Sequence, residues 1–166
     1  LPSPPDGITL FKQMAELGWT PKFSLLIRAS ENVAWSETLG KLGDYATAFA
    51  GWHHDVNYPG VAELNAAYQA QFGRPADVLT GGAYACVQIL ADAIQRAGTL
   101  NRDKIRDAIA VTNMMTVVGN VQFNADGTAI QSDPLMQWVN GKAELVWPLD
   151  QAKVPLAYPA VDFDKR

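Results

Sequence analysis

The stretch "GWHHDVNYPG", Gly51 to Gly60, decides how this chain of 166 residues is organised. It contains both histidines of the chain, His53 and His54, next to Asp55. It is also the point at which the sequence pattern changes from alternating helices and strands to consecutive helices. The stretch is therefore either a metal or catalytic site, or the place where the chain leaves one structural unit for another.

The residues before this stretch predict two helices that alternate with two strands. The first helix carries Leu10, Met14 and Leu17 at helical spacing and stops at Gly18. Two short apolar runs, 22–27 and 45–52, suit buried strands. The segment between them, 30–43, predicts a helix capped by Ser30 or Asn32. This order predicts a parallel sheet covered by helices.

After Trp52 three helices follow without a strand between them. They are predicted over 61–72, 80–97 and 101–111, the first two ending at Gly73 and Gly98 and the third capped by Asn101. The longest helix, 80–97, has one apolar face that we expect to be buried. The residues of this face are Tyr84, Val87, Leu90, Ala91 and Ile94.

The last part of the chain turns to β structure. Residues 115–123 predict strand, and Asn140-Gly141 between two apolar runs predicts a type I′ hairpin. Residues 149–166 have no helical period and predict an extended tail over the surface. Two parallel strands make a poor sheet by themselves. We therefore expect a part of the protein outside these residues to supply further strands, and we expect this chain to fold poorly when it is alone.

Composition excludes several classes of function. A formal charge of −4 gives no basic stripe, so nucleic acid is not an expected partner. The single cysteine, Cys86, lies in an apolar stretch and is expected to be buried and inert. No nucleophile motif, P-loop or dinucleotide motif is present, and no cofactor and no enzymatic activity are predicted.

The order of the motifs resembles one protein family over residues 4–148. The matching segments are "PPDGITLFKQMAELGW" with "PKF", then "GWHHDVNYPGVAELNAAYQAQFGRPAD", "GGAYACVQILADAIQRAGTLNRDKIRDAIA", "TVVGNVQFNADG" and "MQWVNGKAELVWP". This order is similar to that of the type I periplasmic binding proteins of ABC importers, in the branch that binds branched-chain amino acids. The resemblance implies an α/β fold of two Rossmann-like lobes joined by three hinge crossovers, here only partly present.

The resemblance also implies a division of the chain. Residues 1–50 and 134–148 would belong to the C-terminal lobe, 51–56 to a hinge crossover and 57–133 to the N-terminal lobe, with a tail over 149–166 and the third crossover near "QSDP". The partners implied are a small amino acid-like solute, a membrane permease, and the N-terminal half of the same protein as missing residues or a separate chain. The location implied is periplasmic or extracellular, with a lipid anchor allowed.

As a hinge, residues 51–60 need no metal. Adjacent residues of an extended segment point to opposite sides, so His53 and His54 are not expected to hold one ion together, and we predict no metal site.

The ligand residues are expected where loops and helix N-termini face the cleft between the lobes. Ser3 and Pro4 precede the first helix, and the loop after the first strand offers Glu31 for a ligand ammonium, with Arg28 or Ser30 as alternatives. An equally good interpretation is that residues 3–6 are a stiff, capped loop and that Glu31 is a surface carboxylate.

The remaining candidates come from the hinge and from the second lobe. Trp52 would wall the cleft, while Gly81 and Gly82 would leave empty a space that relatives fill with an aromatic side chain. Tyr84 is a weaker candidate, because an aromatic residue there also suits the core. The predicted function is solute binding for an ABC importer; the alternative is a cytoplasmic or receptor-type sensor built on the same fold.

Overall fold

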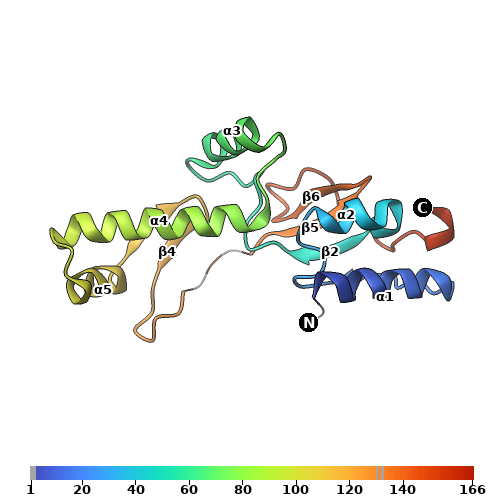
Figure 1. Cartoon of the computed structure of the whole chain (residues 1–166), viewed down its shortest axis with the longest axis horizontal. Coiled ribbons are helices and arrows are strands. Elements are labelled where there is room, and N and C mark those ends of the chain that lie inside the picture. Colours follow the sequence, from blue (N-terminus) through green and yellow to red (C-terminus); the bar gives the residue numbers. More distant parts are fainter. Residues whose placement is uncertain (1–2, 130, 132) are drawn as a thin grey trace.

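The computed structural model describes residues 3–129, 131 and 133–166, and in it the chain forms two lobes (Figure 1). We call residues 3–50 with 134–166 the sheet lobe, and residues 57–129 the helical lobe. Residues 51–56 connect them. Ser132 is not among the described residues, so part of the predicted crossover "QSDP" lies outside them.

The sheet lobe is built on four strands in the order β1-β2-β5-β6. The strands are β1 (Ser24–Leu25), β2 (Ala46–Phe49), β5 (Leu135–Val139) and β6 (Lys142–Trp147). The predicted parallel pair is present, because β1 runs parallel to β2. The expectation that these strands lack partners is wrong, because β2 also pairs antiparallel with β5. The first residue of β5, Leu135, lies 86 residues after the last residue of β2, Phe49.

Helices cover this sheet, and their apolar side chains form its core. They are α1 (Pro4–Glu16), α2 (Ala34–Leu39) and the 3-10 turn η1 (Gly40–Gly43). Phe11 meets Trp35 edge to face with ring centroids 4.7 Å apart, and both are almost fully buried. The predicted stripe of α1 is only partly right, because Met14 is buried whereas Leu10 and Leu17 are exposed.

Neither residue predicted as the cap of α2 is its N-cap, which is Val33, but Asn32 lies directly before it and bonds the first residue of the helix. Asn32 accepts a hydrogen bond from the Ala34 amide at 2.9 Å. Ser30 does not cap the helix, because its hydroxyl donates to the Leu26 carbonyl at 3.1 Å.

The hairpin and the tail complete the sheet lobe. Asn140 and Gly141 both have positive φ, 51° and 76°, which confirms the type I′ turn between β5 and β6. The tail is largely extended as predicted, but it ends in the short 3-10 turn η2 (Phe163–Lys165). The prediction of a purely superficial tail is wrong at Phe163, which is buried against Phe11.

The helical lobe consists of three helices and a hairpin. They are α3 (Val61–Phe72), α4 (Val78–Ala97), α5 (Arg102–Ala110), β3 (Asn113–Thr116) and β4 (Gly119–Gln122). The predicted caps are present: Gly73 and Gly98 adopt left-handed conformations, and Asn101 accepts from the Lys104 amide. None of the described helices, the 20-residue α4 included, is apolar enough to cross a membrane.

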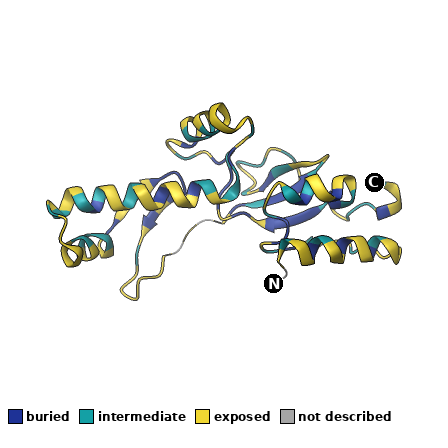
Figure 2. Cartoon of the chain, viewed as in Figure 1, coloured by how far each residue is buried: buried dark blue, intermediate teal, exposed yellow. Residues whose placement is uncertain are grey.

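The long helix α4 buries a different face from the predicted one. Its buried residues are Gly81, Ala85 and Ala93, whereas Tyr84 and Val87 are 47% and 64% exposed. Figure 2 shows the outer side of α4 coloured as exposed along much of its length. Cys86 lies there too, so the prediction of a buried thiol is wrong. Small residues are buried because they allow the close approach of Trp52 and the β3-β4 hairpin, and the apolar stripe is left without a covering layer among the described residues.

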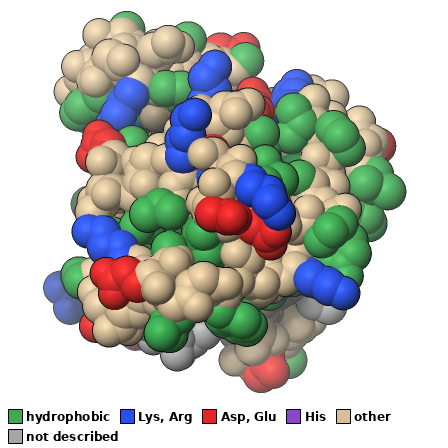
Figure 3. Space-filling model, turned by 90° about the vertical axis from the view of Figure 1, so that its right-hand side faces the viewer, with side chains coloured by type: hydrophobic (Ala, Val, Ile, Leu, Met, Phe, Trp, Pro, Cys, Tyr) green, Lys and Arg blue, Asp and Glu red, His purple; other side chains and the backbone are tan. Residues whose placement is uncertain are grey.

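The far end of the sheet lobe presents mixed charges. Figure 3 shows Lys and Arg side chains interspersed with Asp and Glu and separated by apolar side chains. The face seen there carries no basic stripe.

Candidate functional site

A cavity of about 450 Å³ lies where the two lobes meet. Its residues come from both lobes and from the connection between them. They are Glu31, Val33, Trp138 and 141–144 of the sheet lobe, 74–78 of the helical lobe, and His53, His54 and Asp55. A small molecule in this cavity would touch both lobes at once.

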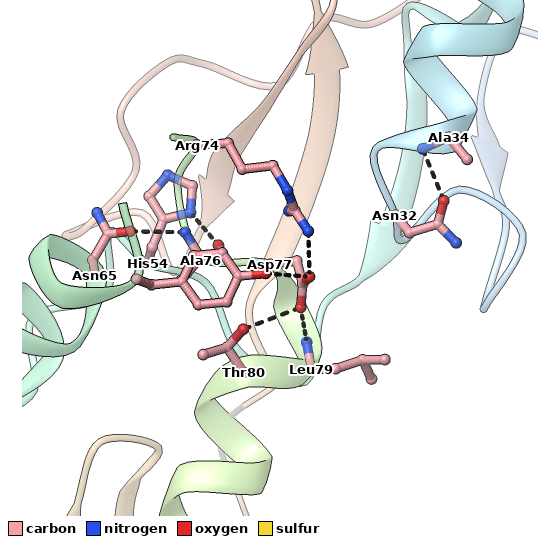
Figure 4. Close-up of polar contacts among 10 residues, drawn as sticks. Asn32, Ala34, His54, Asn65, Arg74, Ala76, Asp77, Leu79 and Thr80 are labelled. Atoms are coloured by element: carbon pink, nitrogen blue, oxygen red, sulfur yellow. Dashed lines mark hydrogen bonds and ion pairs between the residues drawn. The ribbon is translucent and has the colours of Figure 1, made fainter. Parts of the chain in front are cut away.

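Asp77 organises the wall that the helical lobe contributes. One carboxylate oxygen accepts from the Leu79 amide at 3.2 Å and the Thr80 hydroxyl at 3.1 Å, which caps α4. The other accepts from the Arg74 guanidinium at 3.4 Å and from the Tyr68 hydroxyl at 3.3 Å. Figure 4 shows this arrangement, with the start of α2 on the opposite side of the view. Asp77 therefore positions Arg74 at the cavity.

The residue before Asp77, Ala76, is also held by polar contacts of its backbone. The Ala76 amide donates to the Asn65 side chain at 2.8 Å, and the Ala76 carbonyl contacts His54 Nδ1 at 3.0 Å (Figure 4). The loop before α4 is thereby tied both to α3 and to the connection between the lobes.

Glu31 is the predicted ligand residue that the sheet lobe brings to the cavity. One of its carboxylate oxygens accepts a short hydrogen bond from the Arg28 amide. Arg28 has a φ of 72°, so the loop is sharply turned there, and the carboxylate of Glu31 closes the turn. The other carboxylate oxygen has no hydrogen bond among the described residues.

The sequence predicted that the two histidines point to opposite sides, and this prediction is wrong. Their rings are stacked, with centroids 4.3 Å apart and planes inclined by 25°. The physical reason is that residues 53–56 form a turn, closed by a hydrogen bond from the Val56 amide to the His53 carbonyl, rather than an extended segment.

His53 is buried and uncharged. Its side chain is 1% exposed, and burial, together with repulsion from His54, lowers its pKa from 6.5 to about 4. Its Nε2 contacts the Ala143 carbonyl at 3.1 Å. The stacked pair thus joins β6 of the sheet lobe, through His53, to the loop before α4, through His54.

The other predicted ligand residues of the sheet lobe lie outside the cavity lining. Ser3 is the N-cap residue of α1, and both its hydroxyl and its amide donate to the Asp6 carboxylate, at 2.6 and 3.3 Å; Pro4 is the first residue of the helix. Arg28 is exposed at the turn. Ser30 is fully buried, and its carbonyl accepts from the Trp138 indole at 2.7 Å, so the expectation that it faces the cleft is wrong.

Trp52 and Gly81 form a packing contact instead of a cleft wall beside an open space. Trp52 is 1% exposed, and its indole donates to the Val117 carbonyl at 2.8 Å. A Cβ added at Gly81 would lie 2.2 Å from that indole. The space at Gly81 is therefore filled, contrary to the prediction. At Gly82 it is open, and Tyr84 lies on the exposed face of α4 rather than in the core.

Sequence reasoning did not place the loop before α4 or residues 141–144 at the site. A signal for the first existed, because "GRPAD" places a proline and a helix-capping aspartate directly before the longest helix. Residues 141–144, the end of the hairpin turn and the start of β6, carry no signal for the cavity, since their position there depends on how the hairpin packs.

Fold and cavity together define a class of protein in which two lobes of helices and strands are joined by connecting segments, with a cavity between them. The chain matches the family of periplasmic binding proteins over residues 2–143, and it belongs to that family. This confirms the resemblance and the fold predicted from the sequence.

Solved structures with the same fold are binding proteins of ABC transporters. The leucine-binding protein LivK of Thermotoga maritima has a TM-score of 0.77 and 23% identity, with 86% of this chain and 41% of that one covered. LivJ of Streptococcus pneumoniae, solved with isoleucine, has a TM-score of 0.75 and 19% identity, with 86% and 41% covered.

A third structure was solved with a different kind of ligand. It is a solute-binding protein of R. palustris in complex with benzoate, with a TM-score of 0.62, 15% identity, and 93% and 47% of the two chains covered. The chain thus spans less than half of the length of each of these structures.

Proposed function

We propose that this chain forms part of the substrate-binding component of an ABC importer, and that it traps an amino acid or related solute between two lobes. The observation that carries the proposal is the cavity, because the sheet lobe, the helical lobe and their connection all line it. A solute that contacts both lobes stabilises the closed arrangement by its higher affinity for that arrangement.

The sheet lobe, on this proposal, belongs to the C-terminal lobe of the family and the helical lobe to its N-terminal lobe. Two crossing segments support the assignment. The Ala50 amide donates to the Pro134 carbonyl at 2.9 Å, and the Gly51 amide to the Asp133 side chain at 2.7 Å. Two connections therefore run side by side between the lobes, as a hinge requires.

The charges at the cavity suit a zwitterion. Glu31, with one carboxylate oxygen left over from the Arg28 turn, is the candidate for a ligand ammonium. Arg74 makes one hydrogen bond to Asp77 and keeps further N–H donors for a carboxylate. Branched-chain or aromatic amino acids, aromatic acids and amides all remain within this proposal, since the benzoate and isoleucine complexes share the fold.

The proposed partners follow from the family. They are a membrane permease and the N-terminal half of the binding protein, as further residues or as a second chain. The uncovered apolar stripe of α4, with Leu79, Val87 and Leu90 at 74%, 64% and 45% exposure, supports the companion half. The proposed location is periplasmic or extracellular, with a lipid anchor as one means of attachment.

The first experiment is a thermal-shift screen of the full-length protein against amino acids, aromatic acids and small amides. A ligand at a thousand times its dissociation constant stabilises the folded state by about 4 kcal/mol. We expect one chemical class to raise the melting temperature. If no solute in a broad panel does so, the proposal fails.

Glu31→Gln then tests the site with the ligand that is found. Glutamine keeps an oxygen for the Arg28 amide but loses the charge, so the turn is preserved while a ligand ammonium loses its partner. We expect at least a tenfold loss of affinity for an amino acid. Glu37→Gln, an exposed carboxylate on α2, is the matched control and should bind normally. Equal affinity in both variants would remove Glu31 from the site.

A further inference from the structure

Three consecutive residues of the connection between the lobes bring metal-binding atoms together. His53, His54 and Asp55 each offer one ligand atom, and these atoms lie within 4.8 Å of one another. Asp55 Oδ2 is 3.9 Å from His53 Nδ1 and 3.9 Å from His54 Nε2. The carboxylate therefore faces one nitrogen of each ring.

The far nitrogens of both rings are held by carbonyl oxygens. His53 Nε2 contacts the Ala143 carbonyl and His54 Nδ1 the Ala76 carbonyl, at 3.1 and 3.0 Å. A carbonyl can only accept, so both of these nitrogens carry the proton. The nitrogens that face Asp55 are consequently unprotonated: His54 Nε2 has a free lone pair, and the lone pair of His53 Nδ1 accepts only a weak hydrogen bond from the Asp55 amide at 3.2 Å. Metal-binding histidines are oriented in the same way, with the second nitrogen donating to a carbonyl.

The triad also has access to solvent. His54 is 20% exposed and Asp55 33% exposed, and both line the inter-lobe cavity and a second, neighbouring cavity beside Gln151 and Lys153. The Asp55 carboxylate has no hydrogen bond among the described residues, so it is free to move. An ion could reach these two residues without unfolding of the connection.

We propose that His54 Nε2, Asp55 Oδ2 and His53 Nδ1 bind a divalent transition-metal ion such as Zn²⁺ at the connection between the lobes. Imidazole nitrogens with one carboxylate suit zinc, which takes ligand atoms at about 2.0–2.2 Å and leaves a fourth position for water or a solute. The site is independent of which solute the cavity binds.

Binding requires a small local rearrangement. Tetrahedral ligands of zinc lie about 3.3 Å apart, so the Asp55 carboxylate must approach the rings, and the partly exposed His54 ring must tilt out of the stack. The cost includes a weak hydrogen bond of 3.2 Å from the Asp55 amide to His53 Nδ1. Because His53 is tied to β6 and His54 to the loop before α4, the bound ion would couple the two lobes.

The test is calorimetric titration of the full-length protein with ZnCl₂, after treatment with a chelator and without any solute. We expect one ion per protein. His54→Ala and Asp55→Asn should each weaken binding at least tenfold, and both alter partly exposed side chains, so folding can be checked by circular dichroism. Asp107→Asn, at an exposed carboxylate on α5, is the matched control and should bind as the wild type does.

A spectroscopic measurement separates this site from binding elsewhere. Co²⁺ in place of Zn²⁺ should give visible absorption bands that disappear in His54→Ala but not in the control. Absence of zinc binding in the wild type, or wild-type affinity for zinc in both His54→Ala and Asp55→Asn, overturns the proposal. Neither outcome touches the proposed solute binding, which is measured with the chelator present.

Discussion

The sheet lobe and the helical lobe solve the problem of burial differently. In the sheet lobe, helices cover the strands, and large side chains such as Phe11, Trp35 and Met136 are almost fully buried. In the helical lobe, α4 buries small residues and α5 buries none. The largest fully buried side chain there is Trp52, which comes from the connection. The sheet lobe is close to a complete hydrophobic unit, whereas the helical lobe depends on material outside its own residues.

The contrast predicts that mutations of the sheet-lobe core have the largest effect on stability. Trp35 is fully buried, and its indole donates to the Gly43 carbonyl at 2.9 Å. Trp35→Ala should lower the free energy of unfolding by about 4 kcal/mol, measured by urea denaturation with circular dichroism. Trp147→Ala, at a residue 50% exposed, should cost less than about 1 kcal/mol. Similar losses for both would show that burial in the sheet-lobe core does not determine the size of the effect.

The buried histidine between the lobes should make stability depend on pH. The pKa of His53 is about 4 in the folded protein and 6.5 when unfolded, with His54, Asp55 and Lys153 as the neighbouring charges. Between these values the unfolded state binds a proton that the folded state does not. The free energy of unfolding should therefore fall by up to roughly 3 kcal/mol as pH drops from about 6.5 to 4.

This dependence can be assigned to His53 with a matched variant. His53→Gln has no titrating group but keeps a donor for the Ala143 carbonyl. Urea midpoints measured with a chelator across this pH range should show a shallower slope in the variant. An unchanged slope would place the titration on other groups.

The contact between the connection and α4 can be broken at one position and left alone at the next. Gly81→Ala would place a Cβ against the Trp52 indole, and overpacking of this kind costs about 1–3 kcal/mol. Gly82→Ala meets no atom within 4 Å and should stabilise the helix by roughly 0.5–1 kcal/mol. Thermal denaturation of both variants checks the prediction, and equal effects of either sign would contradict it.

The smallest effect is expected on the exposed stripe of α4. Val87→Ser, at a residue 64% exposed, should change the stability of the 166-residue chain by no more than about 0.5 kcal/mol. In a full-length protein whose companion half covers this stripe, the same change should cost more than about 1 kcal/mol. Equal, small effects in both would show that the stripe stays uncovered.

The sequence by itself determined the elements whose signals are local. The type I′ turn at Asn140-Gly141, the glycine ends of α3 and α4 and the Asn101 cap depend on neighbouring residues, and all were predicted. The family could be inferred as well, because the order of helices and strands is itself a property of the sequence.

Tertiary structure alone decided which surfaces are buried. The apolar face of α4 is evident from its period, but period does not say whether a partner exists, and the face that packs is the one with glycine and alanine. The resemblance placed the segments of β2 and β5 in one lobe, but their pairing joins residues far apart in the chain, and no local pattern indicated it.

The candidate site was predicted only in part for the same reason. Glu31 follows a strand and was identified, whereas Arg74 and residues 141–144 reach the cavity through the packing of the two lobes. The stacked histidines depend on a turn that binds a carbonyl from each lobe, Ala143 and Ala76. Contacts between residues distant in sequence leave no local pattern, and such contacts place the two rings together.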